Sequence, residues 1–157
     1  RKKYFLMNII KLIHNMEKKT VITTLIKQHR VLQTNLGSIG DLLVVDKKID
    51  FEKINNFLNQ FKKNLTEHLE LENNVFYPKL LKDMGEKGQD IAKSEQFIAE
   101  MKNIEEVVIS FLEKYKSPQI IEDLLNKFKK EFPIIVETLN LRIESEESGV
   151  YSYWGLF

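Results

Sequence analysis

The sequence contains no cysteine, and this absence removes several kinds of chemistry at once. Without thiols the chain forms no disulfide and offers neither a thiolate metal site nor a cysteine nucleophile. Any metal ion must therefore be held by histidine, aspartate, glutamate or water. A cysteine-free chain suits a reducing compartment, and we expect the protein to be cytoplasmic.

The sequence also has few prolines and glycines, the residues that break helices, and its net charge is small. The 157 residues include only three prolines and six glycines, whereas the abundant Leu, Lys and Glu favour helix. The formal net charge is +1, so no overall field attracts nucleic acid. Apolar residues make up 43% and charged residues 30% of the chain, which is ordinary for a globular domain. The composition predicts an all-α protein without a nucleic-acid partner.

The first sixteen residues combine a basic start with an apolar run. Asn8 and Lys11 interrupt the run, no small-residue cleavage site follows, and the run is too short to span a bilayer. We expect an amphipathic extension over residues 1–16 that forms a short extra helix. It would pack on the main domain, on a protein partner or on a second copy. His14 lies in it and is expected to be a surface residue.

Four long helical patterns make up the main domain, which we expect over residues 17–157. Apolar residues recur at steps of three and four, as on one face of a helix, over residues 17–45, 51–82, 89–116 and about 122–147. Asp46–Lys48, residues 83–88 and Ser117–Pro118 read as links. Short links between long helices predict an antiparallel up-and-down four-helix bundle. The aromatic tail, residues 151–157, is expected to pack on its end or to contact a partner.

Histidine and glutamate interrupt these apolar stripes. His29 lies on the first stripe, and His68 and Glu72 lie on the second. Burying such groups without partners costs about 2–7 kcal/mol or more. Counting the rise of 1.5 Å per residue from each turn places the polar residues at similar heights. The predicted layer contains His29, His68, Glu72, Glu100, Arg142 and Glu146.

An internal echo relates two of these segments. His68-Leu-Glu-Leu-Glu72 matches Arg142-Ile-Glu-Ser-Glu146, and an aromatic end follows each. The echo predicts a pseudo-two-fold relation in which His29 corresponds to Glu100. Imidazoles and carboxylates together suit a first-row metal such as iron, manganese or zinc.

The motifs Gln28-His29-Arg30 and His68-x-x-x-Glu72, the latter running into Val75-Phe76-Tyr77-Pro78, resemble the hemerythrin-like (HHE cation-binding) family over about residues 20–152. The resemblance implies a four-helix bundle around a non-haem di-iron site. Members of that family bind dioxygen, sense oxygen, redox state or iron, or buffer iron. The resemblance implies that the metal ligands include His29, His68, Glu72 and Glu146. Glu100 is expected to be a ligand on the basis of geometry alone.

The chain departs from the family pattern in its second half. No histidine follows residue 68, and Arg142 stands in the place of the fourth-helix histidine. Arginine does not lose its proton or ligate a metal, and its fixed charge repels a second ion. We therefore expect one iron ion, or an asymmetric pair, with another divalent metal as the alternative. An open position on iron would bind dioxygen or another small gas ligand.

A metal-free interpretation uses the same residues. The polar layer would then be a salt-bridge and hydrogen-bond network that fixes helix register in a regulatory bundle. The N-terminal stretch and the aromatic tail would contact its partner. An enzymatic role is the least favoured interpretation, because no substrate pocket or base is evident in the sequence.

Overall fold

The computed structural model describes residues 2–44 and 48–155, and every regular element within them is helical. The prediction of an all-α fold is confirmed. The expected link residues Asp46 and Lys47 and the tail residues Leu156 and Phe157 lie outside the described ranges. The elements, of which η1 and η2 are π-helical, are α1 (Lys2–Leu43), α2 (Phe51–Leu71), η1 (Glu72–Phe76), α3 (Tyr77–Glu86), α4 (Ala92–Lys114), α5 (Pro118–Asp123), α6 (Leu125–Ser145), η2 (Glu146–Tyr151) and α7 (Ser152–Gly155).

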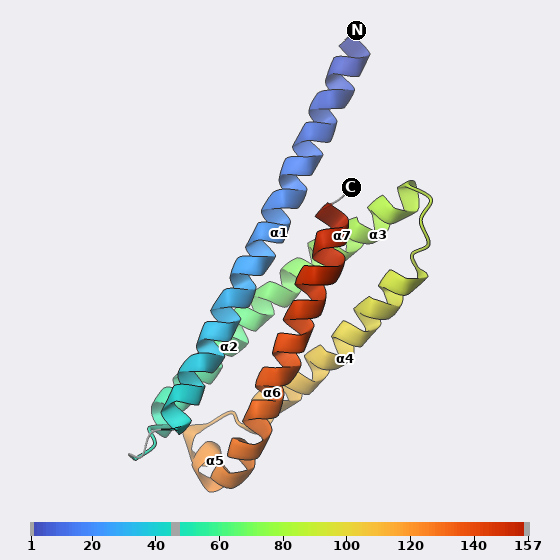
Figure 1. Ribbon diagram of the computed structural model, residues 1–157. Coiled ribbons are helices and arrows are strands. Elements are labelled where there is room, and N and C mark those ends of the chain that lie inside the picture. The colour runs from blue at the N-terminus through green and yellow to red at the C-terminus, as the bar shows by residue number, and fades with distance from the viewer. Residues whose placement is uncertain (1, 45–47, 156–157) are drawn as a thin grey trace.

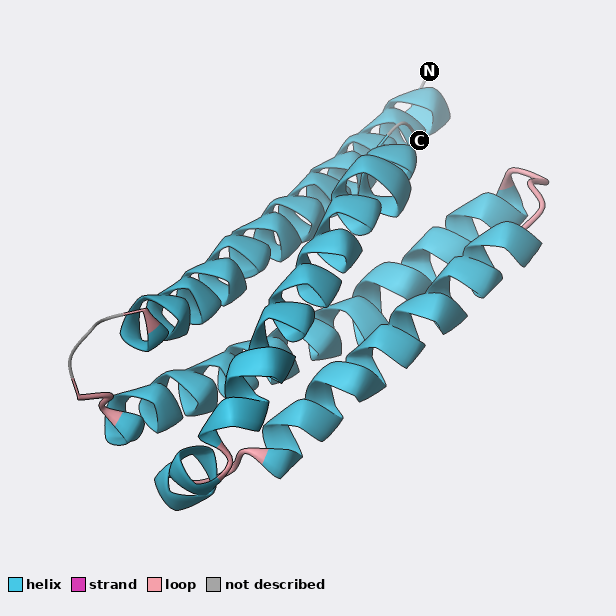
Figure 2. Ribbon diagram, turned by 60° about the horizontal axis from the view of Figure 1, so that its bottom comes forward, coloured by secondary structure: helices cyan, strands magenta, loops and turns pink. Residues whose placement is uncertain are grey.

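The long helices lie lengthwise beside one another, and successive ones run in opposite directions (Figure 1). The turned view in Figure 2 shows loops at the ends of this assembly. Two apolar clusters fill the interior. One cluster contains Leu32, Leu65 and Leu139, and the other contains Leu25 and Phe76.

The N-terminal segment differs from the expectation of a separate short helix. Residues 2–43 form a single helix, because no proline or glycine occurs between Lys2 and Gly37. The helix α1 is continuous, but its packing changes along its length, because Lys18 is its first buried residue. The part before it extends past the other helices in Figure 1. Among the described residues, no helix has the length and apolar character needed to cross a membrane.

The remaining helix ends follow local sequence signals. Asp50 caps α2 by accepting a hydrogen bond from the Lys53 N–H at 3.0 Å, as its position predicts. Pro78 lies in the first turn of α3, where a missing N–H costs little. Ser117 caps the short helix α5, and a break at Leu124 separates it from α6. The last long helix was expected to begin near residue 122, and the break places its start at Leu125.

The buried Asp83 carboxylate joins α1, α3 and α7. Its Oδ2 accepts hydrogen bonds from Trp154 Nε1 at 2.8 Å and from His14 Nε2 at 3.1 Å. Lys18 Nζ lies 3.7 Å from the same oxygen. Trp154 is fully buried, so the expected packing of the aromatic tail on the end of the assembly is found for its described residues. His14 was expected to be a surface residue, and its side chain is 43% exposed where it contacts Asp83.

Asp83→Asn is expected to lower the free energy of unfolding by about 1–3 kcal/mol, because it removes the charge that faces Lys18 and His14 in a buried place. Burial opposes ionisation of Asp83, but the hydrogen bonds from Trp154 and His14 and the charges of His14 and Lys18 outweigh it and lower its pKa. The stabilisation is therefore present above the ordinary pKa of aspartate, about 4, and is lost as the pH falls below it.

Urea unfolding of both proteins across a pH series measures the effect. The difference between wild type and Asp83→Asn should narrow at acidic pH, while the exposed Asp41→Asn should match wild type throughout. Equal stability of the Asp83 variant at neutral pH would contradict this account.

Candidate metal centre

A buried polar layer separates the two apolar clusters. On each contributing segment the polar residues fall between residues of the two clusters, as His29 does between Leu25 and Leu32 on α1. The layer residues come from three segments of the chain. The first is the middle of α1, the second is the junction of α2 and η1, and the third is the junction of α6 and η2. The layer residues are 0–3% exposed: His29, His68, Glu72, Arg142 and Glu146.

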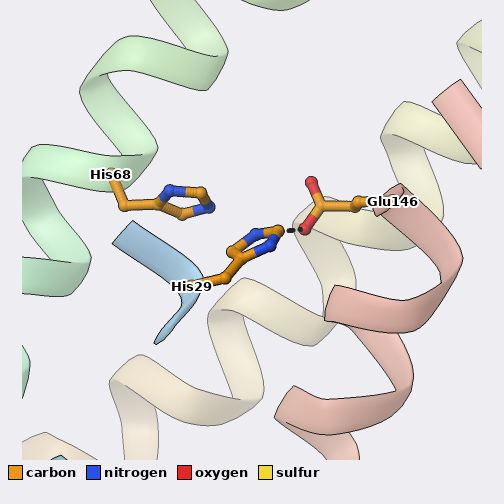
Figure 3. A group of neighbouring side chains, drawn as sticks. All are labelled: His29, His68 and Glu146. Carbon is orange, nitrogen blue, oxygen red and sulfur yellow. Dashed lines mark ion pairs between the residues drawn. The ribbon is translucent and has the colours of Figure 1, made fainter. Parts of the chain in front are cut away.

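Three of these side chains converge closely enough to hold one ion. One ligand atom from each of His29, His68 and Glu146 lies within 4.8 Å of the others, and Figure 3 shows the two imidazoles and the carboxylate pointing toward one another. Ligands about 2.0–2.2 Å from a first-row ion are at most about 4.4 Å apart. Small side-chain shifts therefore bring all three onto a single ion.

Hydrogen bonds on the far side of each imidazole orient its Nε2 inward. Nδ1 of His29 lies 2.7 Å from Glu147 Oε2, and because a carboxylate only accepts, Nδ1 carries the proton. Nδ1 of His68 lies 2.8 Å from Gln28 Oε1, the oxygen of an amide, and likewise donates. In neutral imidazoles with this tautomer, both Nε2 atoms are acceptors. Such outer partners fix the tautomer and orientation of metal-binding histidines.

These inward nitrogens face carboxylate oxygens. His68 Nε2 lies 2.8 Å from Glu72 Oε1, and His29 Nε2 lies 3.5 Å from Glu146 Oε1. Two acceptors this close repel unless a cation or a proton lies between them. The Tyr151 hydroxyl is 3.3 Å from His29 Nε2, but its single proton has a nearer acceptor in Glu72 Oε2, at 3.0 Å. The donor set is thus that of a cation site.

Arg142 holds the other side of the layer. Its Nη2 donates to Glu72 Oε1 at 2.9 Å, its Nε to Glu146 Oε1 at 3.1 Å and its Nη1 to the Met101 carbonyl at 3.1 Å. Burial disfavours its charged form, but Glu146 and Glu72 outweigh that effect and raise the pKa of Arg142. The guanidinium is therefore a permanent cation that bridges both carboxylates.

Burial also decides the charge of the other groups. It lowers the pKa of His68 to about 3, with further lowering by His29 and Arg142 against the opposite effect of Glu146. His68 is thus neutral at neutral pH, the form that binds metal. Burial and the neighbouring Glu72 raise the pKa of Glu146. Two ionised carboxylates against one guanidinium would leave the layer with a net charge of −1, and this negative charge would favour a bound cation.

Two tyrosines complete the layer in a crossed arrangement. Tyr77 donates to Glu146 Oε2 at 2.9 Å, and Tyr151 donates to Glu72 Oε2 at 3.0 Å. Each tyrosine follows the other glutamate by five residues, across the π-helical segments η1 and η2. A π-helix brings residues five apart onto one face. The echo seen in the sequence thus extends to local structure.

Both tyrosines act as hydrogen-bond donors within the layer. Burial and the nearby carboxylates raise the pKa of both hydroxyls, so both remain protonated donors. The repeated spacing Glu-x-x-x-x-Tyr was a signal in the sequence that identifies them. Gln28 and Glu147 are each adjacent to a layer residue in the sequence. No repeated spacing in the sequence predicted their contacts with the histidines.

Glu100 is not part of the layer, which corrects the expectation that it lies there. Its side chain is exposed and accepts a hydrogen bond from Gln96 at 3.3 Å. The neighbouring Met101 faces inward instead, and α4 contributes only the Met101 carbonyl. One residue along a helix is a rotation of about 100°, so a residue at the edge of a stripe readily turns outward.

Comparison with known proteins identifies the family of this arrangement. The family described as hemerythrin HHE cation binding domain matches residues 20–154. No curated protein and no solved structure matches the chain. The matched residues cover most of the chain and include all five residues of the layer. The buried His/Glu cluster, which can hold an ion, agrees with that match. The chain belongs to the hemerythrin HHE cation-binding family, whose domains bind non-haem metal ions.

Proposed function

We propose that the protein binds a single iron ion through His29, His68 and Glu146. The observation that supports this most strongly is the facing of acceptor nitrogens and carboxylate oxygens in a buried layer. Glu72, which the family motif names as a ligand, faces the same His68 nitrogen and is the fourth candidate. Neutral imidazoles and carboxylates are ligands that suit iron.

Arg142 is the reason for proposing one ion. It occupies the place of the fourth-helix histidine, and its guanidinium already bridges Glu72 and Glu146. A second divalent ion beside this cation would make the buried layer strongly positive, at a high cost in a medium of low dielectric constant. The protein would thus be a four-helix-bundle member of its family with a lopsided, mononuclear centre.

The function that this centre supports is the sensing or binding of oxygen, redox state or iron in the cytoplasm. Bound iron would supply a redox-active centre that can accept a small gas ligand. The chain itself would contribute neutral imidazoles, the two tyrosine donors and exclusion of water. Its layer residues are almost fully buried, so access is limited to small molecules.

Nitric oxide added to the ferrous-loaded protein under anaerobic conditions tests this function. We expect about one paramagnetic iron–nitric oxide centre per chain by electron paramagnetic resonance, since iron held by three or four protein ligands keeps a position open. His68→Ala should give no such centre. Protein that retains its iron but gives no signal would contradict the role in gas binding while leaving metal binding intact.

A metal-free regulatory module is the second candidate, and one observation favours it. Among the described residues the only buried side-chain atom without a hydrogen-bond partner is Asn55 Oδ1, so the polar layer is largely satisfied by its own members. Such a network can fix helix register without a metal. An unchanged thermal midpoint with and without EDTA in metal-loaded protein would favour this candidate, because a ligand that binds the native state must raise the midpoint.

A further inference from the structure

The first four turns of α1 expose apolar side chains that the described part of the protein leaves uncovered. Tyr4, Leu6, Met7 and Ile10 are among them. Five others at helical spacing form one side of the helix, which we name the outward face. They are 37–66% exposed: Phe5, Ile9, Leu12, Ile13 and Met16. A patch of this kind on a projecting helix commonly marks an interaction site.

The outward face points away from the rest of the molecule. Along α1 the side that packs inward passes through Leu25 and Lys18 and continues, at steps of three and four, through His14, which contacts Asp83. Met16 is two residues from Lys18, a rotation of about 200° around the helix. The outward face is thus opposite the packed side, and at Ile13 and Met16 it borders Lys79 of α3.

Charge distinguishes between the possible occupants. Lys2 lies on the same side as the outward face, two turns before Ile9, whereas Lys11 lies two turns before Lys18 on the packed side. The first acidic residue of the chain is Glu17. Further along the side of the outward face lies the exposed Lys27. A second copy packed in parallel on the outward face would bring cations against cations, which is unfavourable. An anionic lipid surface complements both the apolar side chains and the lysines.

We propose that the outward face binds an anionic membrane surface. The helix lies in the plane of the headgroups, with Phe5, Leu12 and Met16 at the boundary of the acyl chains. Because the packed side of α1 is opposite, the metal layer stays on the aqueous side.

Co-sedimentation of the full chain with vesicles tests this proposal. We expect binding to vesicles of phosphatidylglycerol and phosphatidylcholine in equal parts, little binding to phosphatidylcholine alone, and weaker binding at high salt. The double variant Phe5→Ser with Leu12→Asn should bind at least about tenfold more weakly, since two apolar side chains no longer enter the boundary of the acyl chains.

The matched control is Tyr4→Ser with Met7→Asn. These residues are equally exposed, at 75% and 56%, but they continue the packed side of α1, so this variant should bind like wild type. Unchanged thermal midpoints would show that both variants are folded. Equal binding to both kinds of vesicle, no binding at all, or a dimer in solution that Phe5→Ser with Leu12→Asn dissociates would overturn the proposal.

Discussion

Replacing Arg142 with methionine is expected to lower the free energy of unfolding of the metal-free protein by about 3–5 kcal/mol. The guanidinium bonds Glu72, Glu146 and the Met101 carbonyl in a layer that excludes water. Methionine retains the volume but leaves two carboxylates buried side by side without their cation. Denaturant unfolding in the presence of a chelator measures the loss.

Arg30→Met is the matched control. Arg30 also pairs with a glutamate, Glu147, but it is half exposed, and exposed pairs contribute only about 0–1 kcal/mol. A divalent metal ion should recover part of the stability lost in the Arg142 variant, because it supplies positive charge to the same carboxylates. A loss below about 1 kcal/mol in the Arg142 variant would mean that the guanidinium does not hold the layer together.

His68→Ala is expected to weaken metal binding by more than about 100-fold. Loss of an outer partner of a metal-binding histidine already costs about 10–100-fold, and His68 supplies a nitrogen to the cluster itself. Competition against a chromophoric chelator with zinc or ferrous iron measures the affinity. His29→Ala should behave in the same way.

The third histidine provides the control for this experiment. His14 is hydrogen-bonded to Asp83 and does not belong to the cluster of His29, His68 and Glu146. His14→Ala should therefore bind metal with wild-type affinity, despite losing an imidazole of the same kind. Equal loss of affinity in the His14 and His68 variants would indicate that metal binding does not depend on the buried His/Glu cluster.

Helical periodicity explains why much of the layer was predictable. His29, His68, Glu72, Arg142 and Glu146 each interrupt an apolar stripe, and a buried polar residue on such a stripe requires partners. Counting the rise along each helix then placed them at one level. The break at Leu124, which makes the last helix begin at the right height, follows from Pro118 and the periodicity after it.

Helical periodicity did not predict the positions of side chains that depend on the exact rotation of a helix or on a local change in its geometry. The third apolar stripe contains Met101, which is buried as that position predicts. Glu100 lies only at the edge of this stripe, and packing turns it outward. The roles of Tyr77 and Tyr151 depend on the π-helical segments, which change the helical rotation just after each glutamate. An α-helical period places residues five apart on different faces. The single helix over residues 2–43 was missed because a change in packing was taken for a helix end.

The number of ions bound per chain tests the central claim most directly. The protein is loaded anaerobically with excess ferrous iron, freed of unbound metal by gel filtration, and analysed for metal and protein concentration. The geometry of His29, His68 and Glu146 beside the fixed charge of Arg142 predicts one iron per chain. Two ions per chain, or none, would contradict it.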